Sequence, residues 1–312
     1  MVRGVRGRKG ALDAALRVEL RALEIEGVRV DEPAGPYTAF SCGGPADAVA
    51  RVTDLDEWAR LLVWCRGHKV VVTHVGWGCG VVVRDSGIVG VVVSTRAMDR
   101  LEPVEAVESD TPRVRIRAEA GVPVRELARR AAGAGADPSE GLADVDGTVG
   151  GLLSRFWPDV RQHVVAVGLL GDRGRVRVRD AAELTDRLPL PGRTALVWAT
   201  FAFPVARGET LFADGRFTTD GAGTADPAVR GKMRLFRDLK DGRKPGEVLA
   251  DLGLCGIRLR GVTIDDRDPN RAINRGEGSA EDLQQLAQYV KRRASESAGV
   301  ELEEAYRLIG KK

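Results

Sequence analysis

A glycine-rich turn between valine-rich runs limits the fold more than any other stretch of this chain. Residues 75–93 read VGWGCGVVVRDSGIVGVVV and place Gly76, Gly78 and Gly80 within five positions. The two valine-rich runs that follow are short and separated by Asp-Ser-Gly, which is typical of β-strands joined by a tight turn. Glycine tolerates positive φ and lets a phosphate approach the backbone. The glycines therefore form either an anion cradle or a tight turn without a ligand.

Helical and strand periods alternate along the rest of the chain. Apolar residues recur at helical spacing in 11–26, and residues 53–68 predict a second helix with Thr53 as its N-cap. Residues 113–121 alternate strictly between apolar and polar, which predicts a half-exposed strand. Near the C-terminus, Ser279 is placed to cap a long predicted helix. The mixture predicts an α+β fold.

The length of the chain predicts two domains, because 312 residues can bury two cores. Residues 1–29 are expected to form an N-terminal tail and helix, and residues 30–205 the first α+β domain. Residues 206–312 are expected to form a second, smaller α+β domain. This domain begins with a stretch rich in Gly, Asp and Thr, which predicts a linker or loop.

The charge balance argues against nucleic acid and membrane partners. With 48 Lys and Arg against 45 Asp and Glu, the net charge of +3 creates no general field that attracts polyanions. The basic N-terminus is short and is interpreted as a solvated tail. No apolar run is long enough to span a bilayer, and no signal-peptide core follows the basic start. We therefore expect a soluble cytoplasmic protein that acts on a small molecule.

Metal binding is not expected from the cysteines and histidines. The four cysteines are widely scattered, and the chain has three histidines, so no metal-type pair occurs. In a reducing compartment, free cysteines are most simply small apolar residues.

A second glycine-rich stretch, GLADVDGTVGG at residues 141–151, follows the predicted helix of residues 122–135. Two such loops could hold a diphosphate on their backbone amides. The spacing is not the dinucleotide fingerprint, however, because no GxGxxG opens a helix after a first strand. No Walker lysine follows either loop.

Several motifs occur in the order and spacing of one known family. They are PYTAFSCGGPADAV, the opening stretch, AGVPVRELARRAAGAG followed by GLADVDGTVGG, and GLCGIRLRGVTI leading to NRAINRGEGSAEDLQQLAQYVKRRASESAGVELEEAYRLIG. They resemble the UDP-N-acetylenolpyruvoylglucosamine reductases, also called UDP-N-acetylmuramate dehydrogenases, over about residues 20–310. The resemblance implies an FAD-binding fold of the vanillyl-alcohol-oxidase (PCMH) type, with two subdomains and a smaller C-terminal domain that holds the UDP-sugar.

The same resemblance implies the cofactors and the residues that hold one of them. In that family NADPH reduces FAD, and the flavin passes a hydride to an enolpyruvyl ether while a serine protonates the neighbouring carbon. The implied FAD-binding residues are Gly76, Gly78, Cys79, Gly80, Gly147, Thr148, Gly150 and Gly151.

The chain departs from the family at positions that carry chemistry. Trp77 and Cys79 stand in a loop that reads Gly-Gly-Gly-Ser-Asn in the family, and Arg234 stands where the proton-donating serine is expected. Ala305 occupies the position of the family's glutamate, unless a one-residue slip brings Glu304 there. Arginine stays protonated and is no matched proton donor. Arg187 is the one candidate for the family's catalytic arginine, but it lacks the tyrosine and serine that surround that arginine in the family. The catalytic residues therefore stay unassigned.

Three functions compete on this basis. The favoured hypothesis is a divergent FAD-binding oxidoreductase that acts on a different small molecule. The alternative is a non-redox or inactive relative that uses the fold as a binding scaffold, with Arg234, Arg237, Arg243 and Lys244 forming either an anion site or a solvated basic face. The peptidoglycan-precursor reductase reaction is the least favoured of the three.

Overall fold

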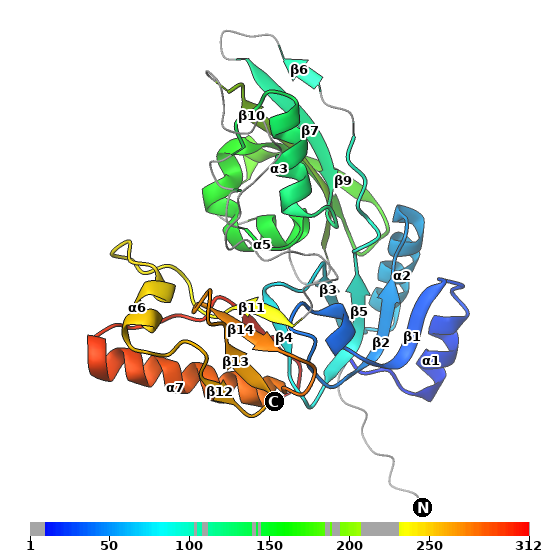
Figure 1. Ribbon diagram of the computed structural model, residues 1–312. Helices are drawn as coiled ribbons and strands as arrows, with labels where there is room; N and C mark the ends of the chain where they lie inside the picture. Colours follow the sequence, from blue (N-terminus) through cyan, green and yellow to red (C-terminus); the bar gives the residue numbers. More distant parts are fainter. Residues whose placement is uncertain are drawn as a thin grey trace, which may run out of the picture. The chain divides into compact units, whose positions relative to one another are not determined.

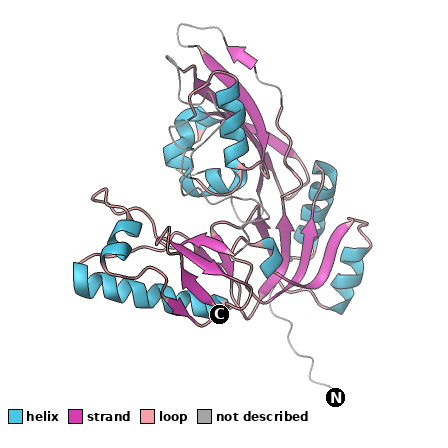
Figure 2. Cartoon of the chain, viewed as in Figure 1, coloured by secondary structure: helices cyan, strands magenta, loops and turns pink. Residues whose placement is uncertain are grey.

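The structure forms two compact units, each built from several segments of the chain. This computed structural model describes residues 10–102, 105–107, 112–138, 142, 145–184, 188, 194–206 and 231–311 (Figure 1). The first unit comprises residues 1–32, 46–76 and 89–222, and the second comprises residues 33–45, 77–88 and 223–312. Figure 2 shows helices and strands in every part, in agreement with the predicted α+β class.

The first unit contains a four-stranded sheet in the order β1-β2-β5-β3. Its strands and helices are β1 (Gly27–Pro33), β2 (Pro45–Arg51), β3 (Val72–Val75), β5 (Ile88–Ser94), α1 (Ala14–Arg21) and α2 (Leu55–Gly67). Strands β3 and β5 are parallel, and β5 is buried over most of its length, as expected for a valine-rich run. Leu20, Trp58 and Leu61 pack in the core of this sheet.

The predicted N-cap of α2 is wrong by one residue. Asp54, rather than Thr53, caps the helix, because the Asp54 carboxylate accepts a hydrogen bond from the Glu57 amide at 2.8 Å. Thr53 lies outside the helix, where its amide and hydroxyl both donate to the Glu57 carboxylate at 2.9 and 2.8 Å. Both residue types are good caps, and the side-chain geometry decides between them.

A five-stranded antiparallel sheet, in the order β6-β7-β10-β8-β9, completes the first unit. Its elements are β6 (Glu105–Val107), β7 (Arg113–Glu119), β8 (Val164–Leu170), β9 (Val176–Asp180), β10 (Ala195–Pro204), α3 (Val124–Gly133), α5 (Val149–Val160) and the 3-10 turns η2 (Arg161–His163) and η3 (Ala181–Glu183). The alternation predicted for β7 is confirmed, because Val114, Ile116 and Ala118 are buried. They pack with α3 and α5 residues such as Leu127 and Leu152.

The second unit is a small α+β body. Its elements are η1 (Gly35–Tyr37), β4 (Val81–Val83), β11 (Lys232–Arg234), β12 (Arg258–Leu259), β13 (Val262–Ile264), β14 (Arg271–Asn274), β15 (Arg307–Ile309), α6 (Pro245–Asp251) and α7 (Ala280–Ala298). The sheet order is β11-β14-β13-β12, and β4 pairs in parallel with β15. The predicted cap of α7 is confirmed, since the Ser279 hydroxyl accepts from the Asp282 amide in a capping box.

The two valine-rich runs are both strands, and a tight turn joins them as predicted. The Gly87 amide donates to the Arg84 carbonyl at 2.9 Å in that turn. The strands nevertheless pair with different partners, because β4 belongs to the second unit and most of β5 to the first. None of the helices that the structure describes is both long and apolar enough to cross a membrane.

Candidate functional site

The two glycine-rich loops meet at Gly76 and Thr148 in the first unit. Gly76 follows β3 directly, and Thr148 is the N-cap of α5. A Cβ atom at Gly76 would lie 2.3 Å from Thr148 Oγ1 and 2.9 Å from its Cγ2, so the contact excludes a side chain. Arg96 Nε donates to the Gly76 carbonyl at 3.3 Å. The sequence grouped these two loops, and the structure places them in contact.

The first turn of α5 has few amides left for a ligand. The amides of Val149 and Gly150 donate to backbone carbonyls in the segment 120–122, at 2.9 and 2.8 Å. The Gly151 amide donates to Thr148 Oγ1 at 3.4 Å. The helix N-terminus is therefore largely satisfied within the protein.

The loop just before α5 has free donors instead. Gly147 has a φ of +120°, which strongly favours glycine. Among the residues that the structure describes, the amides of Gly147 and Thr148 donate to no other group. Consecutive backbone amides of this kind form an anion-binding nest. The loop chemistry fits a phosphate group.

The glycine loop continues in the second unit, where Gly78 has a positive φ of +69°. A Cβ atom at Gly78 would lie 2.5 Å from the Cα atom of Thr38, so the backbone packs tightly here. Gly78 and Gly80 are buried, and their amides donate to no other part of the described chain. Buried donors are normally paired, so these amides also fit a ligand anion.

The described residues contain no group of three or more His, Cys, Asp or Glu side chains that could hold a metal ion. Burial raises the pKa of the Cys42 thiol to about 12, with smaller contributions from the charges of Asp85 and Asp282. A thiol with so high a pKa is unreactive at neutral pH. Cys42 packs in the core of the second unit, as expected for a cysteine that serves as a small apolar residue.

Arg234 is the last residue of β11, and Ala305 lies in a bend of the segment that precedes β15 in the second unit. The Ala305 amide donates to the Leu235 carbonyl at 2.8 Å, next to Arg234 at the end of β11. Ala305 is buried, whereas the carboxylate of Glu304 accepts from Lys291 Nζ at 3.1 and 3.2 Å. The structure thus gives Glu304 a partner of its own.

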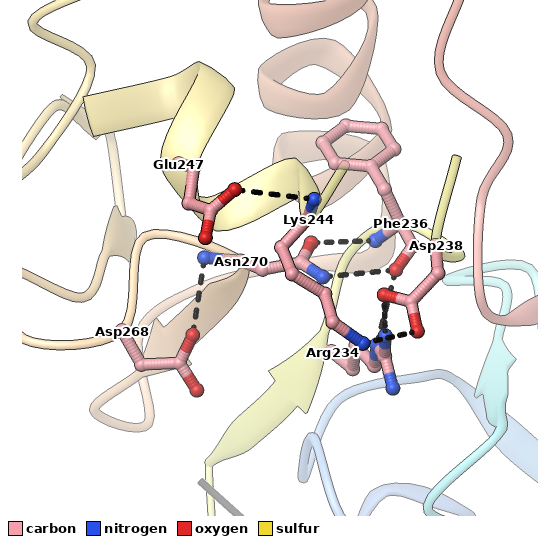
Figure 3. Close-up of polar contacts among 7 residues, drawn as sticks. All are labelled: Arg234, Phe236, Asp238, Lys244, Glu247, Asp268 and Asn270. Carbon is pink, nitrogen blue, oxygen red and sulfur yellow. Dashed lines mark hydrogen bonds and ion pairs between the residues drawn. The ribbon is translucent and has the colours of Figure 1, made fainter. Parts of the chain in front are cut away.

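Asn270 fixes the backbone beside Arg234. Its Oδ1 accepts from the Phe236 amide and its Nδ2 donates to the Phe236 carbonyl, both at 2.9 Å (Figure 3). Asn270 is buried, so both bonds are shielded from water. Arg187, the candidate for the family's catalytic arginine, lies outside the described residues.

Protonation of His74, two residues before Gly76, is expected to destabilise the protein below neutral pH. Burial lowers the pKa of His74 from 6.5 to about 4, and its Nε2 is buried without a hydrogen-bond partner in the described chain. The unfolded state then binds more protons between these values, so stability falls as pH drops from about 6.5 to 4. The loss approaches about 3 kcal/mol.

The measurement is the free energy of unfolding of wild type and His74→Phe, from denaturant titrations across this pH range. The ring of His74 lies 5.6 Å from that of Trp58, so phenylalanine keeps an aromatic contact. We expect the wild-type curve to fall more steeply. Parallel curves would show that His74 does not titrate as described.

Comparison with known proteins decides the family. The FAD binding domain family matches residues 46–166, and the C-terminal domain of UDP-N-acetylenolpyruvoylglucosamine reductase matches residues 204–309. The reductase of that name from Geotalea uraniireducens is 30% identical over 309 residues, which cover 96% of this chain and 97% of the relative. The chain belongs to the UDP-N-acetylenolpyruvoylglucosamine reductase family.

Further relatives agree with this assignment. The UDP-N-acetylenolpyruvoylglucosamine reductase of Rubrobacter xylanophilus is 30% identical and covers 90% of this chain and 95% of its own. The crystal structure of the corresponding enzyme from Thermus caldophilus superposes with a TM-score of 0.65 at 21% identity, covering 90% of this chain and 99% of that one. The predicted fold, a PCMH-type FAD-binding domain with a reductase C-terminal domain, is confirmed.

The comparison overturns the favoured functional hypothesis. The full-length relatives are all named UDP-N-acetylenolpyruvoylglucosamine reductases, so the expectation of a different small-molecule substrate is wrong. Arg234 and Ala305 are two positions, whereas the likeness to the reductases extends over nearly the whole chain. Loss of one acid–base group costs about 10²–10⁴-fold in rate and leaves cofactor binding and orientation in place.

Proposed function

We propose that this chain is an FAD-dependent reductase that uses NADPH to reduce UDP-N-acetylenolpyruvoylglucosamine. The observation that carries the proposal is the identity of 30% to a reductase of that name over nearly the full length of both chains. The presence of both family domains in the order of the relatives supports it.

The glycine loops support the FAD part of the proposal. When bound, FAD would accept a hydride from NADPH and pass it to the substrate. Gly147 and Thr148 would hold its diphosphate on their free amides, while the glycine at position 76 keeps the space beside Thr148 clear. Gly78, Cys79, Gly80, Gly150 and Gly151 remain predicted FAD-binding residues. Of these, the glycines at 150 and 151 would act by allowing close approach, because their amides are already bonded.

Substrate-dependent oxidation of NADPH is the decisive test. Purified protein loaded with FAD is expected to consume NADPH, measured by absorbance, when UDP-N-acetylenolpyruvoylglucosamine is added. Mass spectrometry is expected to show a product that has gained two hydrogens. UDP-N-acetylglucosamine, which lacks the enolpyruvyl group, serves as the control and is expected to leave the rate unchanged. If the flavin-loaded protein oxidises NADPH at the same rate with and without UDP-N-acetylenolpyruvoylglucosamine, the proposed function is contradicted.

The location and domain boundaries follow as part of the same proposal. A reductase that draws on NADPH and a nucleotide sugar would work in the cytoplasm, where both are made. Residues 30–205 would hold FAD and residues 206–312 would hold the UDP-sugar, with residues 1–29 as a tail and helix.

A further inference from the structure

The segment 232–244 is strongly basic, and the structure sorts its charges. It contains six basic residues and two acidic ones. Lys232 Nζ forms an ion pair with Asp265 Oδ2 at 2.8 Å, and Arg243 Nη2 forms one with Asp241 Oδ2 at 2.7 Å. These two cations are each neutralised by a carboxylate. The sequence left open whether this segment forms an anion site or a solvated basic face. An anion site requires cations whose charge is not neutralised in this way.

Arg234 and Lys244 differ because they share a single carboxylate. Arg234 Nη2 lies 2.6 Å from Asp238 Oδ1, and Lys244 Nζ lies 3.0 Å from Asp238 Oδ2 (Figure 3). Burial alone would raise the pKa of Asp238, but the hydrogen bonds and charges of Lys244 and Arg234 bring it below its ordinary value. The carboxylate is therefore ionised at neutral pH, and the group keeps one positive charge in excess.

The guanidinium of Arg234 is held in place yet keeps an open edge. Its Nε donates to the Phe236 carbonyl at 3.1 Å, and Phe236 is itself fixed by Asn270. Within the described chain, Nη1 forms no hydrogen bond or ion pair. The side chain is 33% exposed, so a ligand can reach it. An arginine fixed in this way loses little further entropy when it binds.

We propose that Arg234, positioned by Asp238 and assisted by Lys244, binds an anionic group of the nucleotide-sugar substrate. The inference rests on the proposed function, because that substrate carries both a carboxylate and a diphosphate. Each group presents the oxygen atoms that a guanidinium edge recognises by charge-assisted hydrogen bonds. The excess positive charge of the cluster supplies the complementary field.

Arg258 is a matched control on the same unit. Its Nε donates to the carbonyl two residues further on, at 2.7 Å, and its Nη2 lies 3.4 Å from a Glu277 oxygen. Arg234 has the same two kinds of partner. The side chain of Arg258 is 64% exposed, and among the described residues its partner Glu277 forms no ion pair with a second cation. Arg258→Gln therefore removes one guanidinium without touching the cluster around Asp238.

Calorimetric titration of the FAD-loaded protein tests the proposal without requiring turnover. The probes are UDP-N-acetylmuramate, which has a carboxylate and a diphosphate, and UDP-N-acetylglucosamine, which has the diphosphate alone. Arg234→Gln is expected to weaken binding by about ten- to a hundredfold, the range for a hydrogen bond to a charged group. Arg258→Gln is expected to bind as wild type does. Arg234→Lys, which keeps the charge but not the fork, is expected to lie between wild type and Arg234→Gln.

The two probes distinguish the two anionic groups. A loss confined to UDP-N-acetylmuramate identifies the carboxylate, and a loss for both probes identifies the diphosphate. The proposal is overturned if Arg234→Gln binds both probes as tightly as wild type, or if wild type binds neither. If Arg234→Gln fails to fold, the comparison uses Arg234→Lys, for which wild-type affinity overturns it. Failure of turnover with intact, Arg234-dependent binding would refute the proposed reaction and leave the anion site standing.

Discussion

Replacing Gly76 by alanine is expected to lower the FAD content of the purified protein by about tenfold or more. The added Cβ would lie 2.3 Å from Thr148 Oγ1, in a contact between a β-strand end and a helix cap. Overpacking of this kind costs about 1–3 kcal/mol, and a tenfold loss of affinity corresponds to about 1.4 kcal/mol. Flavin absorbance relative to protein absorbance, after gel filtration, measures the effect.

A control glycine and a double variant separate this clash from general damage. Gly67, at the end of α2, has no atom within 4 Å of an added Cβ, so Gly67→Ala is expected to retain wild-type FAD content. Combining Gly76→Ala with Thr148→Ala removes the closest clashing atoms and is expected to restore part of the binding. The helix cap lost with Thr148 costs about 1 kcal/mol of stability. A Gly76→Ala protein with full FAD content would show that the loop can accommodate a Cβ atom beside Thr148, contrary to the structure.

Replacing Asn274 by leucine is expected to destabilise the second unit by about 4 kcal/mol. The buried Asn274 amide donates to the carbonyls of Phe40 and Gly278 at 3.1 and 3.0 Å, and its Oδ1 accepts from the amides of Gly276 and Gly278 at 2.9 Å each. Leucine has a similar size but satisfies none of these groups, and each buried unpaired group costs about 1–3 kcal/mol. Thermal unfolding followed by circular dichroism is expected to show a drop of about 10 °C.

The matched substitution for this test is Gln285→Leu on α7. Gln285 is also an amide, but it is half-buried and its hydrogen bond to Glu281, one turn earlier, is exposed to solvent, so its loss is expected to change stability by less than about 0.5 kcal/mol. Asn274→Asp keeps the accepting oxygen and loses the donor, so we expect an intermediate effect. Equal midpoints for Asn274→Leu and Gln285→Leu would mean that the four hydrogen bonds contribute nothing net.

Local patterns in the sequence predicted the elements well, because periodicity and capping act over a few residues. The alternation of β7 and the Ser279 cap of α7 were both read correctly. The pairing partners of β4 and β5 could not be predicted in this way. Two equally valine-rich strands joined by a short turn would suit one sheet, and only contacts with distant segments such as β15 place β4 in the other unit.

The parts of the candidate site that depend on backbone conformation could be predicted from the sequence. The parts that depend on side-chain contacts between residues far apart in the sequence could not. A glycine is typical both of closely packed backbone, as at position 76, and of a positive φ, as at position 147, so both features could be predicted from the residue type. Asn274, by contrast, bonds to a backbone carbonyl 234 residues away, and no local pattern signals that contact. In the sequence, Asp238 is one of two acids among six basic residues. Only the structure shows that it forms ion pairs with both Arg234 and Lys244.

The parallel pairing of β4 with β15 has a consequence for how the chain folds during synthesis. Val81–Val83 pair with Arg307–Ile309, which come far later in the chain, so this part of the second unit cannot form until that later segment has been synthesised. At about 5–20 residues per second, β4 leaves the ribosome some 10–45 s before its partner. During that interval an apolar strand has no partner within its own chain. A chain paused at this stage exposes apolar surface that the folded protein buries, and such surface favours aggregation.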